Sequence, residues 1–140
     1  MGNLRSVSKA LEHVVSGNQR VIISSDVQEI ADAERVVFPG QGAARACMQH
    51  LQDLNLNEVV LQAASEKPFL GICMGMQVLM AHSEENQGIN CMGLYAGEVR
   101  AFADEAIKSQ MQSLKIPHMG WSKVSHKQAH PLWQDIQENR

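Results

Sequence analysis

The residue best placed to do chemistry is Cys73, because a glycine stands two positions before it and another two positions after it. The run Gly71-Ile72-Cys73-Met74-Gly75 has the form glycine-x-nucleophile-x-glycine. Glycines here let a strand turn abruptly into a helix, where a Cβ would crowd the turn. The helix N-terminus then favours the thiolate form of the exposed cysteine. We therefore predict that Cys73 is a nucleophile; the alternative is a small buried apolar residue.

A second candidate feature is the loop Pro39-Gly40-Gln41-Gly42, which ends an apolar run. Loops that follow parallel strands gather at the carboxyl edge of the sheet, where α/β proteins place their sites. Two glycines flank Gln41, so the loop can turn its peptide N–H toward a substrate. Together with the N–H of Met74 it would form an oxyanion hole. An ordinary Pro-Gly turn is the alternative.

The other cysteines and histidines show no comparable pattern. Cys47 and Cys91 are far apart in the sequence and outside any Cys-x-x-Cys pair, which argues against a disulfide framework or a zinc knuckle. His126 and His130 are too weak a pair for a metal site. Surface positions on helices or loops, without carboxylate partners, are expected for His13, His50, His82 and His126. No metal and no cofactor are predicted.

The elements that would position these residues follow from apolar periodicity. Short buried strands are predicted at Val21–Ile23, Val36–Phe38 and Phe69–Ile72. Helices are predicted from Leu4, capped by Asn3, to near Gly17, at Ala43–Leu54, Glu58–Ser65 and Met76–Met80. Extended segments are predicted at Leu94–Phe102 and Lys115–Val124. This alternation predicts an α/β fold with a mainly parallel sheet.

Length and charge narrow the class of protein. The 140 residues suit a single domain spanning 1–140. With 12 basic and 15 acidic residues and no basic block, nothing supports nucleic-acid binding. No apolar stretch approaches the roughly 20 residues of a membrane helix, and no signal-peptide layout is present. We expect a cytoplasmic protein.

At this point two segments carry a family resemblance. Phe38–Gly42 followed by Lys67–Gln77 resembles the oxyanion loop and nucleophile elbow of the class I glutamine amidotransferases. Met76 and the segment Pro117–Trp121 are similar to one branch of that family, the glutaminase subunits of imidazole glycerol phosphate synthases, as is the opening Gly2–Val7. The resemblance implies a three-layer, flavodoxin-like α/β fold.

The resemblance also implies a reaction. Cys73 would attack the side-chain amide of glutamine, ammonia would leave, and water would hydrolyse the glutamyl thioester to glutamate. Gly40, Gly42 and Gln77 match substrate-binding positions of the family. The backbone N–H groups of Gln41 and Met74 match its oxyanion hole. No cofactor is implied.

A partner is implied as well. The ammonia would pass to a cyclase subunit, a (β/α)8 barrel, which forms imidazole glycerol phosphate and an aminoimidazole carboxamide ribotide in histidine biosynthesis. The two subunits would form a heterodimer. Met119 and Trp121 match positions that lie against this barrel.

Two departures from the family pattern lead to an expectation about the ends. The family base is a histidine in a late His-Pro-Glu type motif, but His130-Pro131 is followed by Leu132 and matches an earlier segment. Family members also place a strand before the position of Met1. We therefore expect an incomplete copy, lacking the first strand and the C-terminal part with the histidine and glutamate, and inactive alone.

Three alternative functions stay open from the sequence. One is a non-catalytic fragment that keeps only partner binding. Another is an amidotransferase subunit of the anthranilate or aminodeoxychorismate type, which Met76 and Pro117–Trp121 disfavour. The third is a cysteine-elbow hydrolase or redox sensor unrelated to glutamine, which would not need Gln77 or the Pro39–Gly42 loop.

Overall fold

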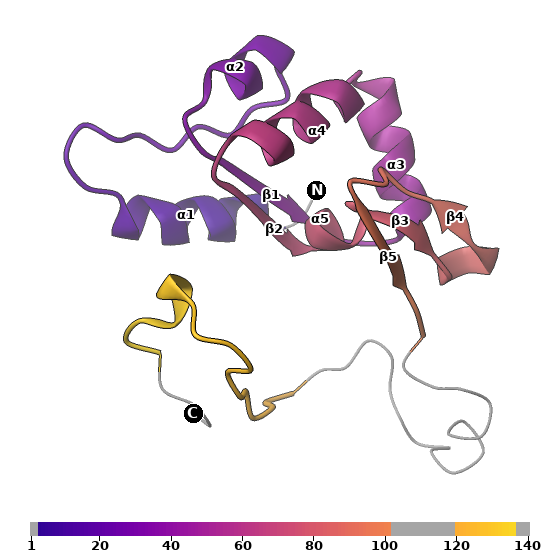
Figure 1. Cartoon of the computed structure of the whole chain (residues 1–140). Coiled ribbons are helices and arrows are strands. Elements are labelled where there is room, and N and C mark those ends of the chain that lie inside the picture. The colour runs from indigo at the N-terminus through magenta and orange to yellow at the C-terminus, as the bar shows by residue number, and fades with distance from the viewer. Residues whose placement is uncertain (1–2, 102–119, 137–140) are drawn as a thin grey trace. The chain divides into compact units, whose positions relative to one another are not determined.

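The computed structural model describes residues 3–101 and 120–136, which fall into two compact units (Figure 1). The first unit lies within residues 1–102 and the second within residues 103–140. Whether the chain acts as a single domain stays a prediction. The predicted extended segment Lys115–Val124 lies partly outside the described residues, and its described part, 120–124, forms no strand.

The first unit alternates helices and strands. Its helices are α1 (Leu4–Val14), α2 (Val27–Asp32), α3 (Ala44–Asp53), α4 (Asn57–Glu66) and α5 (Met74–Gln77), with a 3₁₀ turn η1 (Glu85–Gln87). Its strands are β1 (Val36–Gly40), β2 (Phe69–Cys73), β3 (Met80–Ser83), β4 (Ile89–Asn90) and β5 (Tyr95–Val99). The described part of the second unit contains one 3₁₀ turn, η2 (Pro131–Trp133).

The strands form two small sheets in the described residues. β1 and β2 run parallel and side by side, in a register that pairs Val36 with Phe69 and Gly40 with Cys73 (Figure 1). In the other sheet the order is β4-β3-β5, with β3 antiparallel to β4 and parallel to β5. The α/β class is confirmed. In the described residues two of the three strand pairings are parallel, and they are divided between a parallel pair and a mixed three-stranded sheet.

The core of the first unit is aliphatic and lies where α3, α4 and α5 meet. Its buried members are Ala44, Met48, Leu51, Leu56, Val59, Val60, Met74 and Val78. Phe38 of β1 and Phe69 of β2 pack against this cluster, with ring centroids 6.1 Å apart. Burial of Met74 and Val78 therefore anchors both ends of the turn that follows Cys73.

The prediction of a strand at Val21–Ile23 is wrong. Residues 21–23 form no strand, and the side chains of Ile22 and Ile23 are 52% and 55% exposed. A strand needs a neighbour to satisfy its backbone groups, and no strand of the described residues pairs with this segment. Local β-propensity therefore does not decide the structure here.

The predicted helix at Met76–Met80 is also partly wrong. The helix begins earlier, at Met74, and ends at Gln77, and Met80 already belongs to β3. The carbonyl oxygens of Val78, Leu79 and Met80 accept hydrogen bonds from the N–H groups of Met92, Tyr95 and Gly93, at 2.8, 3.0 and 2.9 Å. These bonds attach residues 78–80 to the β4–β5 connection and to the first residue of β5, so tertiary contacts override helix propensity.

The remaining predicted elements agree with the structure, with one difference in capping. α1, α3 and β5 lie within the predicted segments, and α4, β1 and β2 extend the predicted segments by one or two residues. Asn3 is the residue before α1, as predicted, but its side chain makes no capping hydrogen bond, and its φ of 77° is left-handed. In the part of the chain that is described, no helix is long and apolar enough to cross a membrane.

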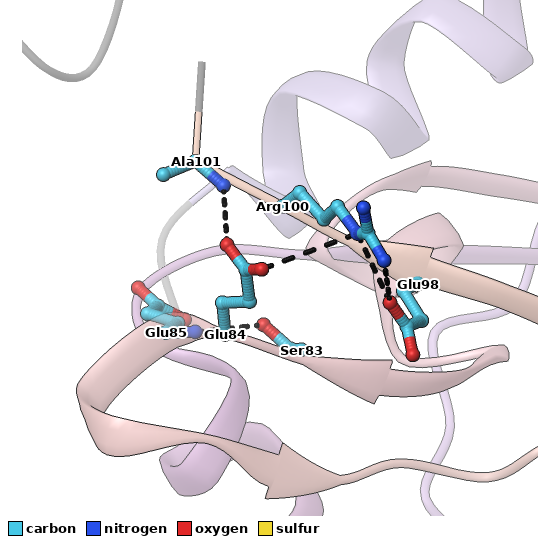
Figure 2. A network of polar contacts seen from close by, with 6 residues as sticks. All are labelled: Ser83, Glu84, Glu85, Glu98, Arg100 and Ala101. Carbon is cyan, nitrogen blue, oxygen red and sulfur yellow. Dashed lines mark hydrogen bonds and ion pairs between the residues drawn. The ribbon is translucent and has the colours of Figure 1, made fainter. Parts of the chain in front are cut away.

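A network of polar contacts joins the ends of β3 and β5. The N–H of Glu84 donates to the carbonyl of Val99, and the Glu84 carboxylate accepts from the N–H of Ala101 at 3.0 Å. Arg100 donates to the Glu98 carboxylate at 2.7 Å and comes within 4.0 Å of Glu84 (Figure 2). These exposed ion pairs are individually weak, and they lie at the ends of β3 and β5.

Candidate active site

The strand-to-helix turn at Cys73 has the geometry of a nucleophile elbow. β2 ends at Cys73 and α5 begins at the next residue. Cys73 has φ 54° and ψ −118°, a conformation that residues with a side chain rarely adopt. Its side chain is exposed. Strained backbone of this kind persists where the surrounding structure fixes it, and such positions are concentrated in active sites.

The two flanking glycines are required by their neighbours. A Cβ on Gly75 would lie 1.9 Å from the carbonyl oxygen of Phe38 in β1, and one on Gly71 would lie 2.8 Å from the Cα of Met76. Both obstacles are backbone atoms, which cannot swing away. The prediction that a Cβ would crowd this turn is confirmed.

The loop after β1 lies directly beside the elbow. Gly40 is the pairing partner of Cys73, and a Cβ on Gly40 would lie 2.7 Å from the backbone nitrogen of Gly75 and 2.9 Å from the Cβ of Met74. Gly42 has φ +86°, in the left-handed region that favours glycine. The loop therefore leaves the sheet at the position where the Cys73 side chain is exposed.

The other residues predicted from the sequence occupy this same edge. Gln41 is an exposed residue of the loop, Met74 is 5% exposed as the first residue of α5, and Gln77 is half-buried as its last residue. One helical turn thus separates Gln77 from the nucleophile. The roles assigned to these residues in holding glutamine and its oxyanion stay predictions.

The environments of the three thiols differ. Cys73 is exposed, whereas Cys47 and Cys91 are half-buried against the core. Burial raises the pKa of both Cys47 and Cys91, because their thiolates would be poorly solvated. Among the described residues, no three histidine, cysteine, aspartate or glutamate side chains are grouped as a metal ion would require.

The sequence interpretation of His82 needs correction. The sequence predicts a surface position on a helix or loop without a carboxylate partner, but His82 lies on β3, directly opposite Glu98 of β5. The pKa of Glu98 is lowered, mainly by its hydrogen bond from Arg100 and to a smaller degree by the charge of His82. Strand β3 was not predicted, so this cross-strand pair was not visible in the sequence.

His130 has a structural position. Its Nδ1 accepts a hydrogen bond from the N–H of Leu132 at 3.1 Å and so caps η2. His126 stacks on Trp133, with ring centroids 4.9 Å apart. That neither histidine is the general base stays a prediction.

Two residues near the site, Glu85 and Arg45, were not identified from the sequence. The Glu85 carboxylate accepts a hydrogen bond from the N–H of Ala44 at 2.6 Å, and Arg45 donates to carbonyl oxygens of the η1 turn. One signal was available: Ala43, the residue before α3, has no side chain that can cap a helix. The first N–H groups of α3 therefore needed an acceptor from elsewhere in the chain.

The predicted partner contacts fall in the second unit. Trp121 is fully exposed, so within the structure it is not a core residue. Met119 lies outside the described residues. Contact of either residue with a partner stays a prediction.

Comparison with known proteins adds to this geometry. The family described as Glutamine amidotransferase class-I matches residues 2–139. Over 139 residues, 99% of the chain, the sequence is 50% identical to imidazole glycerol phosphate synthase subunit HisH of Hydrogenovibrio crunogenus. The subunit of the same name from Pseudomonas putida is 51% identical over 136 residues, 97% of the chain, and that from Nitrosococcus oceani 52% over 139 residues, 99% of the chain.

These matches cover only part of each relative. The chain spans 63% of the length of the H. crunogenus and P. putida proteins and 64% of that of the N. oceani protein.

Proposed function

Because the chain belongs to the class I glutamine amidotransferase family, we propose that it supplies the nucleophile of a glutaminase that releases ammonia from glutamine. The observation that carries the proposal is the strained, exposed Cys73, held at φ 54° beside Gly40. A merely structural cysteine has no need of that backbone. Neither Cys47 nor Cys91, both half-buried, has a comparable position.

In the proposed reaction the Cys73 thiolate attacks the amide carbon of the glutamine side chain. The carbonyl oxygen becomes an oxyanion, and the backbone N–H groups of Met74 and Gln41 are the donors assigned to it. The proton that the Cys73 thiol gave up returns to the amide nitrogen, and collapse of this intermediate then expels ammonia and leaves a glutamyl thioester on Cys73. Water then attacks the thioester, which releases glutamate and returns the thiol.

The proposal assigns the remaining groups only in part. Gly40, Gly42 and Gln77 are the residues that we assign to substrate binding. Gly40 pairs with Cys73 across β1 and β2, Gly42 follows two residues later in the same loop, and Gln77 ends the helix that begins after Cys73. The family base is a histidine in a His-Pro-Glu type motif, and none of the six histidines stands in such a motif. We therefore assign no base among these residues.

The names of the relatives support a more specific role. They are subunits of imidazole glycerol phosphate synthase, so the ammonia is proposed to pass to a cyclase subunit built as a (β/α)8 barrel. The proposed complex is a cytoplasmic heterodimer of histidine biosynthesis. The full exposure of Trp121 leaves it available to contact that barrel, as proposed also for Met119.

The test measures glutamate release by three proteins, each together with the cyclase barrel: the native polypeptide, its Cys73→Ser variant and, as a matched control, its Cys47→Ser variant. We expect Cys73→Ser to lose turnover by at least about 10³-fold, since it removes the nucleophile, while it still binds the barrel. Cys47→Ser should stay within a few fold of the unchanged protein. Glutamate release that survives Cys73→Ser would refute the covalent mechanism, and its absence in the unchanged protein would refute the glutaminase.

A further inference from the structure

The first residue of α3 depends on an acceptor far away in the sequence. The N–H of Ala44 donates to Oε2 of Glu85 at 2.6 Å, across 41 positions of the chain. Ala44 is completely buried, so without Glu85 its N–H would be left without a partner, which is costly. Ala44 stands two residues after Gly42. The Glu85 carboxylate therefore fixes the end of the loop that borders Cys73.

Glu85 lies at the start of a strained turn. The three residues after it, Asn86, Gln87 and Gly88, all have positive φ, at 51°, 71° and 87°. Left-handed backbone costs about 1–2 kcal/mol for a residue with a Cβ, and Gln87 has none of the tolerance of asparagine or glycine. Such a turn keeps its shape only if its surroundings hold it.

Arg45 is the side chain that holds it. Its Nη2 donates to the carbonyl oxygen of Gly88 at 3.1 Å and to that of Asn86 at 3.4 Å. At the other end of the turn, the N–H of Glu85 donates to Oγ of Ser83 at 3.3 Å (Figure 2), and Ser83 is buried. The turn is thus held at both ends, by β3 and by α3.

The two links between α3 and η1 are reciprocal. Ala44 of the helix donates to the carboxylate of the turn, and the next helical residue, Arg45, donates to the carbonyl oxygens of the same turn. A negative carboxylate at the N-terminus of a ten-residue helix is favourable in addition. Loss of the Arg45 contacts would relax the turn and withdraw Glu85 from Ala44.

We propose that Arg45 is a positioning residue of the glutaminase site: through the η1 turn and Glu85 it fixes the loop Gly40–Gly42 beside Cys73. This inference rests on the proposed function. A loop whose peptide N–H must meet an oxyanion loses efficiency when it is displaced, because stabilisation of the transition state depends on donor position. Arg45 acts through Glu85, without contact to the substrate.

The experiment compares Arg45→Met with Arg45→Lys and with Arg20→Met, an exposed arginine outside the helices and strands. In Arg45→Met we expect hydrogen exchange at the Ala44 amide to accelerate at least about tenfold, and kcat for glutamine to fall about tenfold with KM within about twofold. Arg45→Lys keeps a donor near the carbonyls and should recover part of both effects. Arg20→Met should match the unchanged protein.

The outcomes separate this inference from the proposed function. Unchanged Ala44 exchange in Arg45→Met would overturn the link from Arg45 to the loop. Faster exchange with undiminished kcat would overturn its catalytic importance, as would a loss of activity fully explained by a smaller folded fraction. Failure of the proposed function is seen elsewhere, as absence of glutamate release by the unchanged protein with its cyclase barrel.

Discussion

Gly75→Ala is the change that tests the elbow geometry most severely. In the interior of an ordinary helix, alanine is more favourable than glycine by about 1 kcal/mol. Here the new Cβ would lie 1.9 Å from the carbonyl oxygen of Phe38, whereas ordinary contact begins at 3.4 Å. Either α5 or β1 must therefore move by about 1.5 Å. This one contact therefore turns a substitution that would stabilise an ordinary helix into one that destabilises the protein.

The magnitude follows from the size of that displacement. Overpacking of a rigid site costs about 1–3 kcal/mol, sometimes more, and in a unit of this size about 1 kcal/mol shifts Tm by roughly 4–8 °C. We expect Tm to fall by at least about 4 °C. Because Gly75 is two residues from Cys73, a shift of about 1 Å should also reduce glutaminase turnover by about 10²-fold.

The matched control is Gly97→Ala on β5. The Cβ at this position would meet one atom within 4 Å, the sulfur of Met80 at 3.0 Å, which is the movable end of a flexible side chain. Its Tm should stay within about 2 °C of the unchanged protein. Thermal unfolding of both variants under one set of conditions decides the matter. If Gly75→Ala is as stable as Gly97→Ala, the close approach of α5 to β1 is wrong.

Two other predictions concern the thiols and the partner. Iodoacetamide should label Cys73 first near neutral pH, because its side chain is exposed. Burial raises the pKa of Cys47 and Cys91, so their labelling should accelerate only as the pH rises past the ordinary cysteine pKa. Peptide mapping checks the order, and faster labelling of Cys47 or Cys91 would contradict it. Trp121→Ala should weaken binding of the cyclase barrel by about 2 kcal/mol or more and leave Tm unchanged, since the side chain is fully exposed; a lower Tm with unchanged affinity would refute the contact.

The elbow could be predicted from the sequence because its causes are local. The pattern Gly71, Cys73, Gly75 predicts the turn from five consecutive residues, and the structure shows that a Cβ on either glycine would collide with backbone atoms. The adjacent loop at Gly40 followed from a simple rule, that parallel strands end at one edge. The structure agrees with this rule, because Gly40 and Cys73, the last residues of β1 and β2, are paired.

The failures have causes that act across the chain. Val21–Ile23 has the composition of a strand but no strand of the described residues pairs with it. The helix after Cys73 stops at Gln77, and Met80 already belongs to β3, whose partners β4 and β5 come later in the chain. The hydrogen bond from Ala44 to Glu85 joins residues 41 positions apart, and no local sequence pattern predicts it. Pairing of this kind is set by tertiary packing, which one sequence does not display.

The most direct test of the account is to look for the glutamyl thioester itself. The native polypeptide with its cyclase barrel is mixed with glutamine, quenched in acid within the first turnovers, digested and analysed by mass spectrometry. The account predicts that the peptide containing Cys73 gains the mass of one glutamyl group, that the modification is lost on treatment with hydroxylamine, and that Cys73→Ser shows none. Glutamate release without any modified Cys73 peptide, or a glutamyl group on Cys47 or Cys91 instead, would contradict it.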